Sequence, residues 1–129
     1  MIVLGIDPGT ATTGYGIITE RDSQPIMVVC GVIATPANQP LPERLITIHH
    51  EVARLIEEYH PDQAAVEQLF FNKNVRTALA VGHARGVVML ALAEKNVPIF
   101  EYTPLEVKQA VTGNGRADKK QIQEMIKIL

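Results

Sequence analysis

The sequence begins with a nearly unbroken apolar run, residues 2–6 (IVLGI), which stops at Asp7 and a Pro-Gly pair. A continuous apolar run that ends at turn residues is typical of a strand buried on both faces. Asp7 is the last residue before the break, so we expect its carboxylate at the tip of this strand. An aspartate in this position can also be a simple turn former, because its side chain accepts hydrogen bonds from nearby backbone N–H groups.

The rest of the chain predicts an α/β fold with one mixed sheet flanked by helices. Two extended segments, about residues 13–19 and 26–35, follow at short range, and short links favour antiparallel pairing into a three-stranded meander. Apolar residues recur at helical spacing over about 41–60, and a second short apolar run ends at Glu67. A strand, a helix and a strand in this order predict a parallel crossover. The remaining predicted elements are a helix over 75–94, a strand over 98–102 and a helix that begins at Thr103.

Glu67 closes its predicted strand just as Asp7 closes the first one. Parallel neighbours point their carboxyl ends the same way, so the two carboxylates converge at one edge if these strands pair. Ligand sites in open α/β sheets lie outside such carboxyl ends. Clustered acids repel each other unless a proton or a cation lies between them, and oxygen ligands suit Mg²⁺ or Mn²⁺. The alternative is that the two acids are unrelated.

The predicted helix over residues 75–94 is apolar on nearly all sides, with Arg85 as one of its few polar residues. One side can cover the sheet, which leaves the other in need of a partner. Ala78, Gly82 and Gly86 recur at every fourth position and form a smooth ridge that another helix can approach closely. That helix can belong to the same domain or to the second subunit of a homodimer, and we take the three small residues as the candidate dimer interface.

Charge is unevenly distributed along the chain. The net charge is −2, but residues 1–67 hold three Lys or Arg against nine Asp or Glu, whereas residues 68–129 hold nine against five. Such asymmetry favours a localised binding face, with scattered solvated charge as the alternative. The candidates for contacts with nucleic acid are an aromatic residue and the basic residues of this second half: Phe70, Lys73, Arg76, Lys108, Arg116, Lys119 and Lys120.

The remaining composition fits one cytoplasmic globular domain over residues 1–129. The length and a hydrophobic content of 47% allow a core of ordinary size. The N-terminus lacks a signal-peptide pattern, and no apolar run reaches membrane-spanning length, so no membrane partner is expected. Cys30, the single cysteine, suits a reducing compartment, and we expect it to be inert filler in an apolar strand.

Four short motifs, in this order, resemble the RuvC-type Holliday junction resolvases of bacteria. They are Gly5-Ile6-Asp7-Pro8-Gly9 with Thr13-Gly14-Tyr15-Gly16, Glu67-Gln68 with Phe70, Ala84-Arg85-Gly86, and Val107-Lys108-Gln109. The resemblance implies a ribonuclease H-like fold and a homodimer that cuts paired strands of a four-way DNA junction with two divalent metal ions per subunit. Mg²⁺ is the expected metal, with Mn²⁺ as a substitute, and a branch-migration helicase complex is the implied protein partner.

The same resemblance implies roles for individual residues. Asp7 and Glu67 match the first two metal-binding acids of the family. Phe70 matches its junction-stacking aromatic residue. Lys108 and Lys119 match its catalytically important basic residues near the DNA.

One departure from the family matters for activity. The family places its last two metal ligands on a C-terminal helix, and this chain ends at Leu129, before that helix. Residues 1–129 are therefore expected to bind junctions but to cut them poorly, and a junction-binding module without catalysis is one alternative. Half of an actin-like ATPase is another, because such proteins carry a similar Asp-x-Gly-Thr motif, but a second lobe and a second phosphate loop are missing from this sequence.

Overall fold

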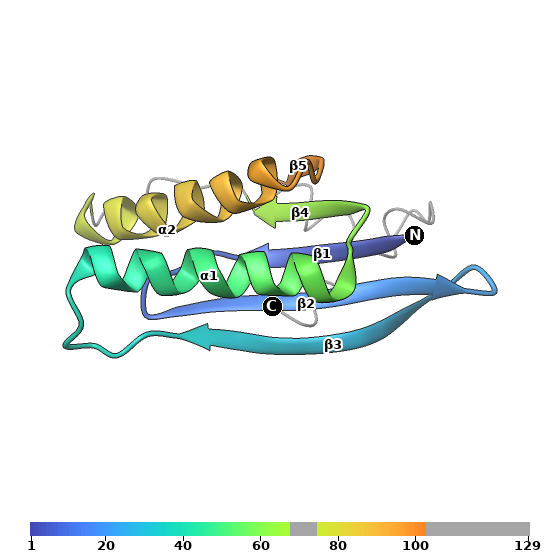
Figure 1. The fold of residues 1–129 in the computed structure, drawn as a ribbon, viewed down its shortest axis with the longest axis horizontal. Coiled ribbons are helices and arrows are strands. Elements are labelled where there is room, and N and C mark those ends of the chain that lie inside the picture. The colour runs from blue at the N-terminus through green and yellow to red at the C-terminus, as the bar shows by residue number, and fades with distance from the viewer. Residues whose placement is uncertain (68–74, 103–129) are drawn as a thin grey trace.

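The computed structural model describes residues 1–67 and 75–102 of the chain. Within these ranges the chain forms five strands and two helices (Figure 1). In chain order they are β1 (Ile2–Asp7), β2 (Thr12–Arg21), β3 (Gln24–Ala34), α1 (Leu41–Tyr59), β4 (Gln63–Glu67), α2 (Val75–Glu94) and β5 (Ile99–Tyr102). The elements predicted up to residue 102 are therefore present, with bounds that differ by a few residues at most. The predicted helix that begins at Thr103 lies outside the described residues.

β1 lies in the middle of a mixed sheet with the strand order β3-β2-β1-β4-β5. It pairs antiparallel with β2, and β2 pairs antiparallel with β3, as the short links predicted. On its other side β1 pairs parallel with β4, which in turn pairs parallel with β5. The predicted meander with added parallel strands is thus confirmed. Neighbours on both sides explain why residues 3–6 of β1 are buried.

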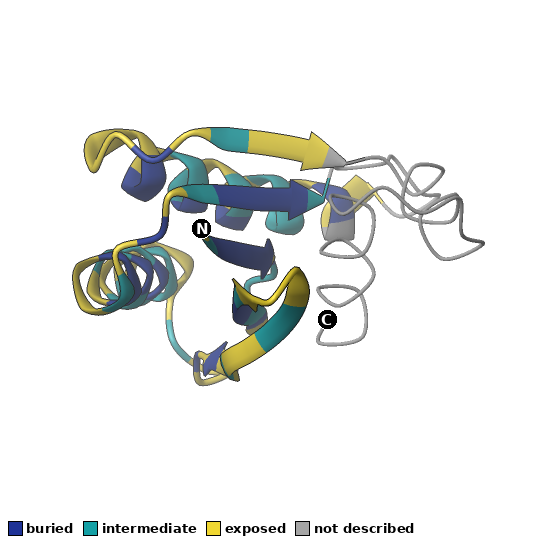
Figure 2. Ribbon diagram, turned by 90° about the vertical axis from the view of Figure 1, so that its right-hand side faces the viewer, coloured by how far each residue is buried: buried dark blue, intermediate teal, exposed yellow. Residues whose placement is uncertain are grey.

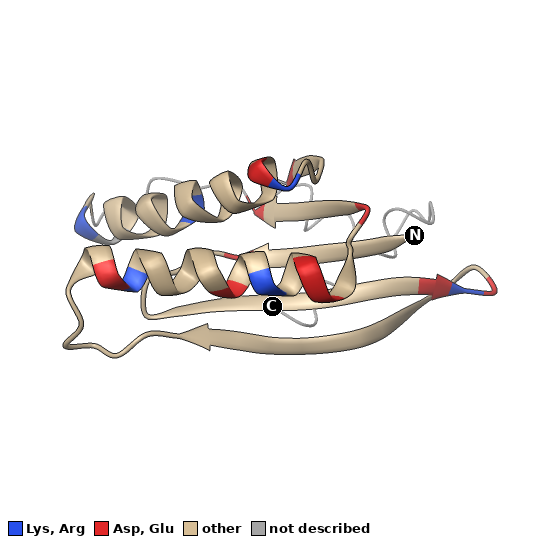
Figure 3. Ribbon diagram, viewed as in Figure 1, with Lys and Arg blue, Asp and Glu red and all other residues tan. Residues whose placement is uncertain are grey.

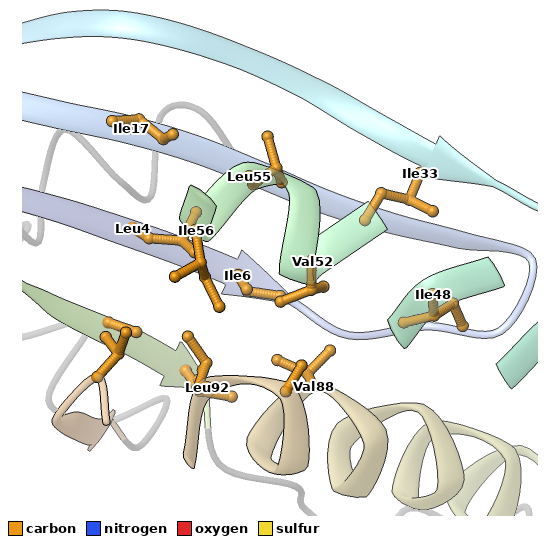
Figure 4. Close-up of a cluster of buried hydrophobic side chains, with 14 of the residues drawn as sticks. Leu4, Ile6, Ile17, Ile33, Ile48, Val52, Leu55, Ile56, Val88 and Leu92 are labelled. Atoms are coloured by element: carbon orange, nitrogen blue, oxygen red, sulfur yellow. The ribbon is translucent and has the colours of Figure 1, made fainter. Parts of the chain in front are cut away.

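α1 and α2 pack on the same face of the sheet, each with an apolar stripe toward it. The core residues that Figure 4 labels are Leu4, Ile6, Ile17 and Ile33 from the strands, Ile48, Val52, Leu55 and Ile56 from α1, and Val88 and Leu92 from α2. Val3, Ile18 and Ala65 form a separate buried cluster. Because side chains alternate along a strand, this second cluster belongs to the opposite face of the sheet. Figure 2 distinguishes the buried residues of each element from the exposed ones.

Polar contacts join the two helices, which lie side by side in Figure 1. His49 Nε2 of α1 lies 2.6 Å from Glu94 Oε1 at the end of α2. The ammonium group of Lys95 pairs with Glu57. α1 has a proline in its first turn and ends at Tyr59, and the next residue, His60, has a φ of 49°, the left-handed conformation common just after helix ends. The two polar contacts tie α1 to the end of α2, and the apolar core ties both helices to the sheet.

The turn that follows Asp7 is closed by the buried side chain of Thr13. Its hydroxyl donates to the Gly9 carbonyl at 2.7 Å, and the Gly9 N–H donates to the same hydroxyl at 3.3 Å. A side chain at position 9 would place its Cβ 2.3 Å from the carbonyl oxygen of Thr12, so this position requires glycine.

Thr35, directly after β3, ties the same turn to α1. Its N–H donates to the Ala11 carbonyl at 3.0 Å, and its hydroxyl donates to the Thr10 carbonyl. Arg44 Nε of α1 in turn donates to the Thr35 hydroxyl at 2.9 Å. The chain just beyond the tip of β1 is therefore held from β3 and α1.

Cys30 is exposed, so the expectation that it is packed as filler within its strand is wrong. The reason is the position of β3 at the edge of the sheet, where much of the strand faces solvent. In the two described ranges, no helix combines the length and the apolarity needed to cross a membrane.

We expect Thr13→Val to destabilise the protein by about 1–3 kcal/mol, because it leaves the N–H and carbonyl of Gly9 without their hydroxyl partner. Thr19→Val is the matched control, since the Thr19 hydroxyl of the same strand donates to the Met1 carbonyl at an exposed position. Water can replace that bond, so the control should lose only about 0.5 kcal/mol or less. Urea unfolding measures both losses, and equal losses would show that the turn does not depend on Thr13.

Candidate metal centre

Asp7 and Glu67 are brought together by the parallel pairing of β1 and β4. The paired residues extend to Ile6 opposite Val66, and Asp7 and Glu67 are the next residue of each strand. Both strands point the same way, and Figure 3 shows acidic residues at both arrowheads. Ile6 and Val66 belong to the core that faces the helices. Because side chains alternate, the two carboxylates lie on the opposite face, at the carboxyl edge of the sheet.

The two carboxylates interact and are partly withdrawn from water. Burial raises the pKa of Asp7 above its ordinary value, although the residue keeps exposed surface. Burial also raises the pKa of Glu67, and the negative charge of Asp7 raises it further. This repulsion is consistent with the parallel pairing of β1 and β4, which brings the two strand ends to the same edge as predicted. A cation between them would remove the repulsion and favour both ionised forms.

The available donors fit a hard divalent cation. Carboxylate oxygens are the ligands that Mg²⁺ prefers, and Mg²⁺ commonly binds through one or two carboxylates while it keeps several waters. Among residues 1–67 and 75–102, no group of three or more His, Cys, Asp or Glu side chains is placed to hold a metal ion. The described part of the chain therefore offers a centre with two carboxylates, which leaves coordination positions for water or for oxygens of a substrate.

Arg85 of α2 reaches the same end of β4, a contact that the sequence did not predict. Its Nη2 lies 2.6 Å from Glu101 Oε1 of β5, and its Nε donates to the Glu67 carbonyl over 3.4 Å. The signal in the sequence was that a charged residue interrupts an apolar helix, but periodicity does not tell where its guanidinium lies. The structure places that guanidinium against the main chain of a candidate metal ligand.

Most of the predicted DNA contacts and both predicted catalytic lysines lie outside the described residues. These are Phe70, Lys73, Lys108, Arg116, Lys119 and Lys120. Arg76 is described, and it is exposed in the first turn of α2. That turn lies at the end of the molecule toward which β1 and β4 point in Figure 1. Because α2 covers the face of the sheet opposite to the two carboxylates, its first turn shares with them only this end of the molecule.

The three small residues of the predicted dimer interface do not share one exposed face. Ala78 is only 4% exposed, Gly82 is half-buried, and Gly86 is exposed with open space where a Cβ would lie. Two steps of four residues rotate a helix by about 80° beyond two full turns, so Ala78 and Gly86 point in different directions. The large apolar side chains that α2 exposes are Val75, Leu79 and Leu90.

The chain is similar to known proteins over nearly its whole length. A family model described as "Crossover junction endodeoxyribonuclease RuvC" matches residues 3–129. A protein of that name from Alkaliphilus oremlandii (strain OhILAs) is 58% identical, over 100% of this chain and 79% of its own length. Its counterpart from Desulfitobacterium hafniense (strain DSM 10664 / DCB-2) is 54% identical, over 100% of this chain and 78% of its own length. The solved structure "T. thermophilus RuvC in complex with Holliday junction substrate" is 35% identical with a TM-score of 0.80, over 85% of this chain and 69% of that chain.

These similarities agree with the architecture of the described residues. The fold is similar to that of the T. thermophilus protein and is ribonuclease H-like, as the motifs implied. Both relatives are identical to this chain at more than half of the aligned positions, and the alignments cover its whole length. The chain belongs to the RuvC family of crossover junction endodeoxyribonucleases.

Proposed function

We propose that the protein is a structure-selective endonuclease that resolves four-way DNA junctions in homologous recombination and DNA repair. Its family supports nuclease activity, and the structure of the T. thermophilus relative is described as a complex with a Holliday junction. The observation in this chain that carries the proposal is the convergence of Asp7 and Glu67 at the carboxyl edge of β1 and β4. Two carboxylates in that place support metal-dependent hydrolysis of phosphodiester bonds in paired strands.

In this proposal Asp7 and Glu67 hold Mg²⁺, with Mn²⁺ as a substitute, and the complete site takes two ions per subunit. Bound divalent cations supply an activated water and neutralise the charge of the leaving oxygen. The residues of the chain bind and orient: Asp7 keeps exposed surface that a phosphodiester can reach, and the Thr13 hydroxyl fixes the turn beside it. Lys108 and Lys119 act near the reacting phosphate, as the family resemblance implies.

The contacts to DNA are proposed from charge and stacking. Arg76 is exposed in the first turn of α2 and is proposed to contact a phosphate of the DNA. Phe70 next to Lys73 suits stacking on an unpaired base. The proposed phosphate contacts in the remainder of the chain are Lys108, Arg116, Lys119 and Lys120. A branch-migration helicase complex is the proposed protein partner, by family resemblance.

The outer face of α2 is the proposed homodimer interface. Val75, Leu79 and Leu90 are exposed there and lie within about 60° of helical rotation. Gly86 lies between them in the same stripe and leaves open space, so a second helix can approach closely. A two-fold dimer carries two identical sites, which suits the two symmetric strands of a four-way junction.

In the full-length protein, with the C-terminal helix that the family resemblance implies, Asp7→Asn should abolish cleavage of a synthetic four-way junction and leave junction affinity nearly intact. The change keeps the shape of the side chain but removes a metal-binding charge, whereas DNA affinity depends on basic residues. We expect cleavage in Mg²⁺ to fall by more than about 100-fold. Even the loss of a residue that only orients a metal ligand typically lowers metal affinity or activity by about 10- to 100-fold. Gel shifts in EDTA measure affinity beside the cleavage assay.

The matched control for this experiment is Asp62→Asn. The Asp62 carboxylate accepts a hydrogen bond of 2.7 Å from the Ile2 N–H, where β1 begins and far from its carboxyl tip. An amide oxygen can accept the same bond, so the control should cut at the wild-type rate. Cleavage near the wild-type rate by Asp7→Asn itself would show that the metal assignment is wrong.

The raised pKa values of Asp7 and Glu67 predict that their charges destabilise the metal-free fold near neutral pH. A carboxyl group with a higher pKa in the folded state binds its proton more tightly there. The stability that this proton contributes is lost as the pH rises from about 4, the ordinary carboxyl range, through the raised folded value. Asp7→Asn should therefore melt at a higher temperature than wild type at pH 7 in EDTA, and the advantage should shrink as the pH falls toward 4.

Glu57→Gln is the control with the opposite sign. The hydrogen bond and the charge of Lys95 lower the pKa of Glu57, so the charge of Glu57 contributes stability at neutral pH that is lost in acid. Its substitution should lower the melting temperature at pH 7. Scanning fluorimetry over a pH series measures both variants, and Mg²⁺ should raise the melting temperature of wild type far more than that of Asp7→Asn. If Asp7→Asn instead melts below wild type at pH 7 in EDTA, the assigned electrostatic cost is absent.

Leu79→Lys should convert the dimer to a monomer, because it places a charge in the middle of the proposed apolar contact. Leu79 is 60% exposed in the isolated chain, so the fold itself should tolerate the change. Val32→Lys is the matched control: Val32 is 64% exposed on β3, outside the proposed interface, and its substitution should leave the dimer intact. Sedimentation at micromolar concentration distinguishes the two states, and a monomeric wild-type protein would refute the proposed dimer.

A further inference from the structure

The Arg85 guanidinium lies where three elements meet: α2, which carries it, and the ends of β4 and β5. Its Nη2 pairs with Glu101 Oε1 of β5 at 2.6 Å, and its Nε donates to the Glu67 carbonyl over 3.4 Å. Its Nη1 lies 3.2 Å from Met89 Sδ on the next turn of its own helix. The side chain is only 17% exposed, so these contacts fix most of the guanidinium in one place.

The contact with Glu67 matters because of where the ladder between β1 and β4 ends. The last paired residues are Ile6 and Val66, so Glu67 lies one residue beyond the pairing that positions β4 against β1. On its other side Glu67 is paired with Tyr102 of β5. The direction of the Glu67 side chain toward Asp7 therefore depends on how β5 and α2 hold the end of β4.

The geometry of the guanidinium explains why arginine suits this position. A planar fork can donate in two directions at once, whereas a lysine ammonium acts as a compact point charge. The bond of 3.4 Å to the Glu67 carbonyl is long and is weak by itself. The short ion pair with Glu101 sets the plane of the fork, and the contact with the carbonyl follows from it. Glu101 also neutralises the positive charge, so the main effect of Arg85 on Glu67 is mechanical.

We propose that Arg85 is a positioning residue of the metal site: with Glu101 it holds the main chain of Glu67 so that the carboxylates of Glu67 and Asp7 face one cation. This inference rests on the proposed function of Asp7 and Glu67 as metal ligands. It assigns Arg85 no contact with the cation or with DNA. Residues that contact a metal ligand, but not the metal itself, keep that ligand oriented. Their loss typically weakens metal affinity or activity by about 10- to 100-fold.

A purely structural tie between α2 and β5 would behave differently. Its removal would lower the melting temperature, but the folded fraction of the variant would bind a cation with unchanged affinity. Cation affinity, measured directly and below the melting temperature, therefore separates the two roles.

The test is calorimetric titration of the full-length protein with Mn²⁺, without DNA. Arg85→Lys keeps the charge and loses the fork, so its Kd for Mn²⁺ should rise by about tenfold. The Mn²⁺ concentration for half-maximal junction cleavage should rise by the same factor, while junction affinity in EDTA stays unchanged. Glu101→Gln, which keeps an acceptor but loses the charge, should show a smaller rise in Kd. Arg54→Lys is the matched control, because Arg54 pairs with Glu51 and Glu58 on the exposed side of α1, each at 2.9 Å.

Each outcome decides the proposal. Unchanged Mn²⁺ affinity in folded Arg85→Lys and Glu101→Gln would overturn it, as would a failure of both variants to fold, which would make the pair a structural tie. Asp7→Asn in the same titration tests the underlying metal site: if it binds Mn²⁺ as tightly as wild type, the proposed function fails. If Asp7→Asn loses affinity and Arg85→Lys does not, only the positioning role fails.

Discussion

The parallel pairing of β1 with β4 is the constraint on which the rest of the structure depends. A parallel neighbour requires a crossover, and α1 supplies it on the face where the main core forms. The alternation along β4 fixes the register, because Ala64 and Val66 face the helices and Ala65 faces the other way. A slip by one residue would turn Glu67 toward the helix core and expose apolar side chains. The position of the acid pair is therefore specified by hydrophobic packing and not by any attraction between the acids.

The negative charges of Asp7 and Glu67 are expected to destabilise the metal-free fold. Hydrogen bonds fix the chain around Asp7. Burial raises the pKa of both Asp7 and Glu67, so the ionised pair costs stability near neutral pH. The Thr13 hydroxyl closes the turn after Asp7, and Thr35 links that turn to α1 through Arg44. These bonds restrict the ways in which the chain could separate the two charges. In the proposed metal site, a bound cation would remove this repulsion, and these bonds would make a costly rearrangement unnecessary.

Local signals in the sequence were sufficient to predict the helices and strands and the convergence of Asp7 and Glu67. They were insufficient to predict which side of each element is buried. β1, α1 and α2 were predictable because apolar periodicity and turn residues act over a few positions. The convergence of Asp7 and Glu67 required only that each closes a strand and that a crossover makes those strands parallel. The exposure of Cys30 and the burial of Ala78 were not predictable in the same way. Each depends on which neighbour covers a given side of an element, and that is decided by the assembled sheet.

α2 connects the end of β4, which it contacts through Arg85, with the exposed apolar side that is the proposed dimer interface. Its inner side packs in the core and sends Arg85 to the end of β4, whereas its outer side exposes Leu79 and Leu90. A helix is a rigid element, so the two sides keep a fixed relation to each other. In the proposed dimer, the helix that contacts the partner is also the helix that holds the main chain of Glu67. The spacing of the two metal sites would then be set by one rigid element in each subunit, which is what paired cuts in a two-fold DNA substrate require.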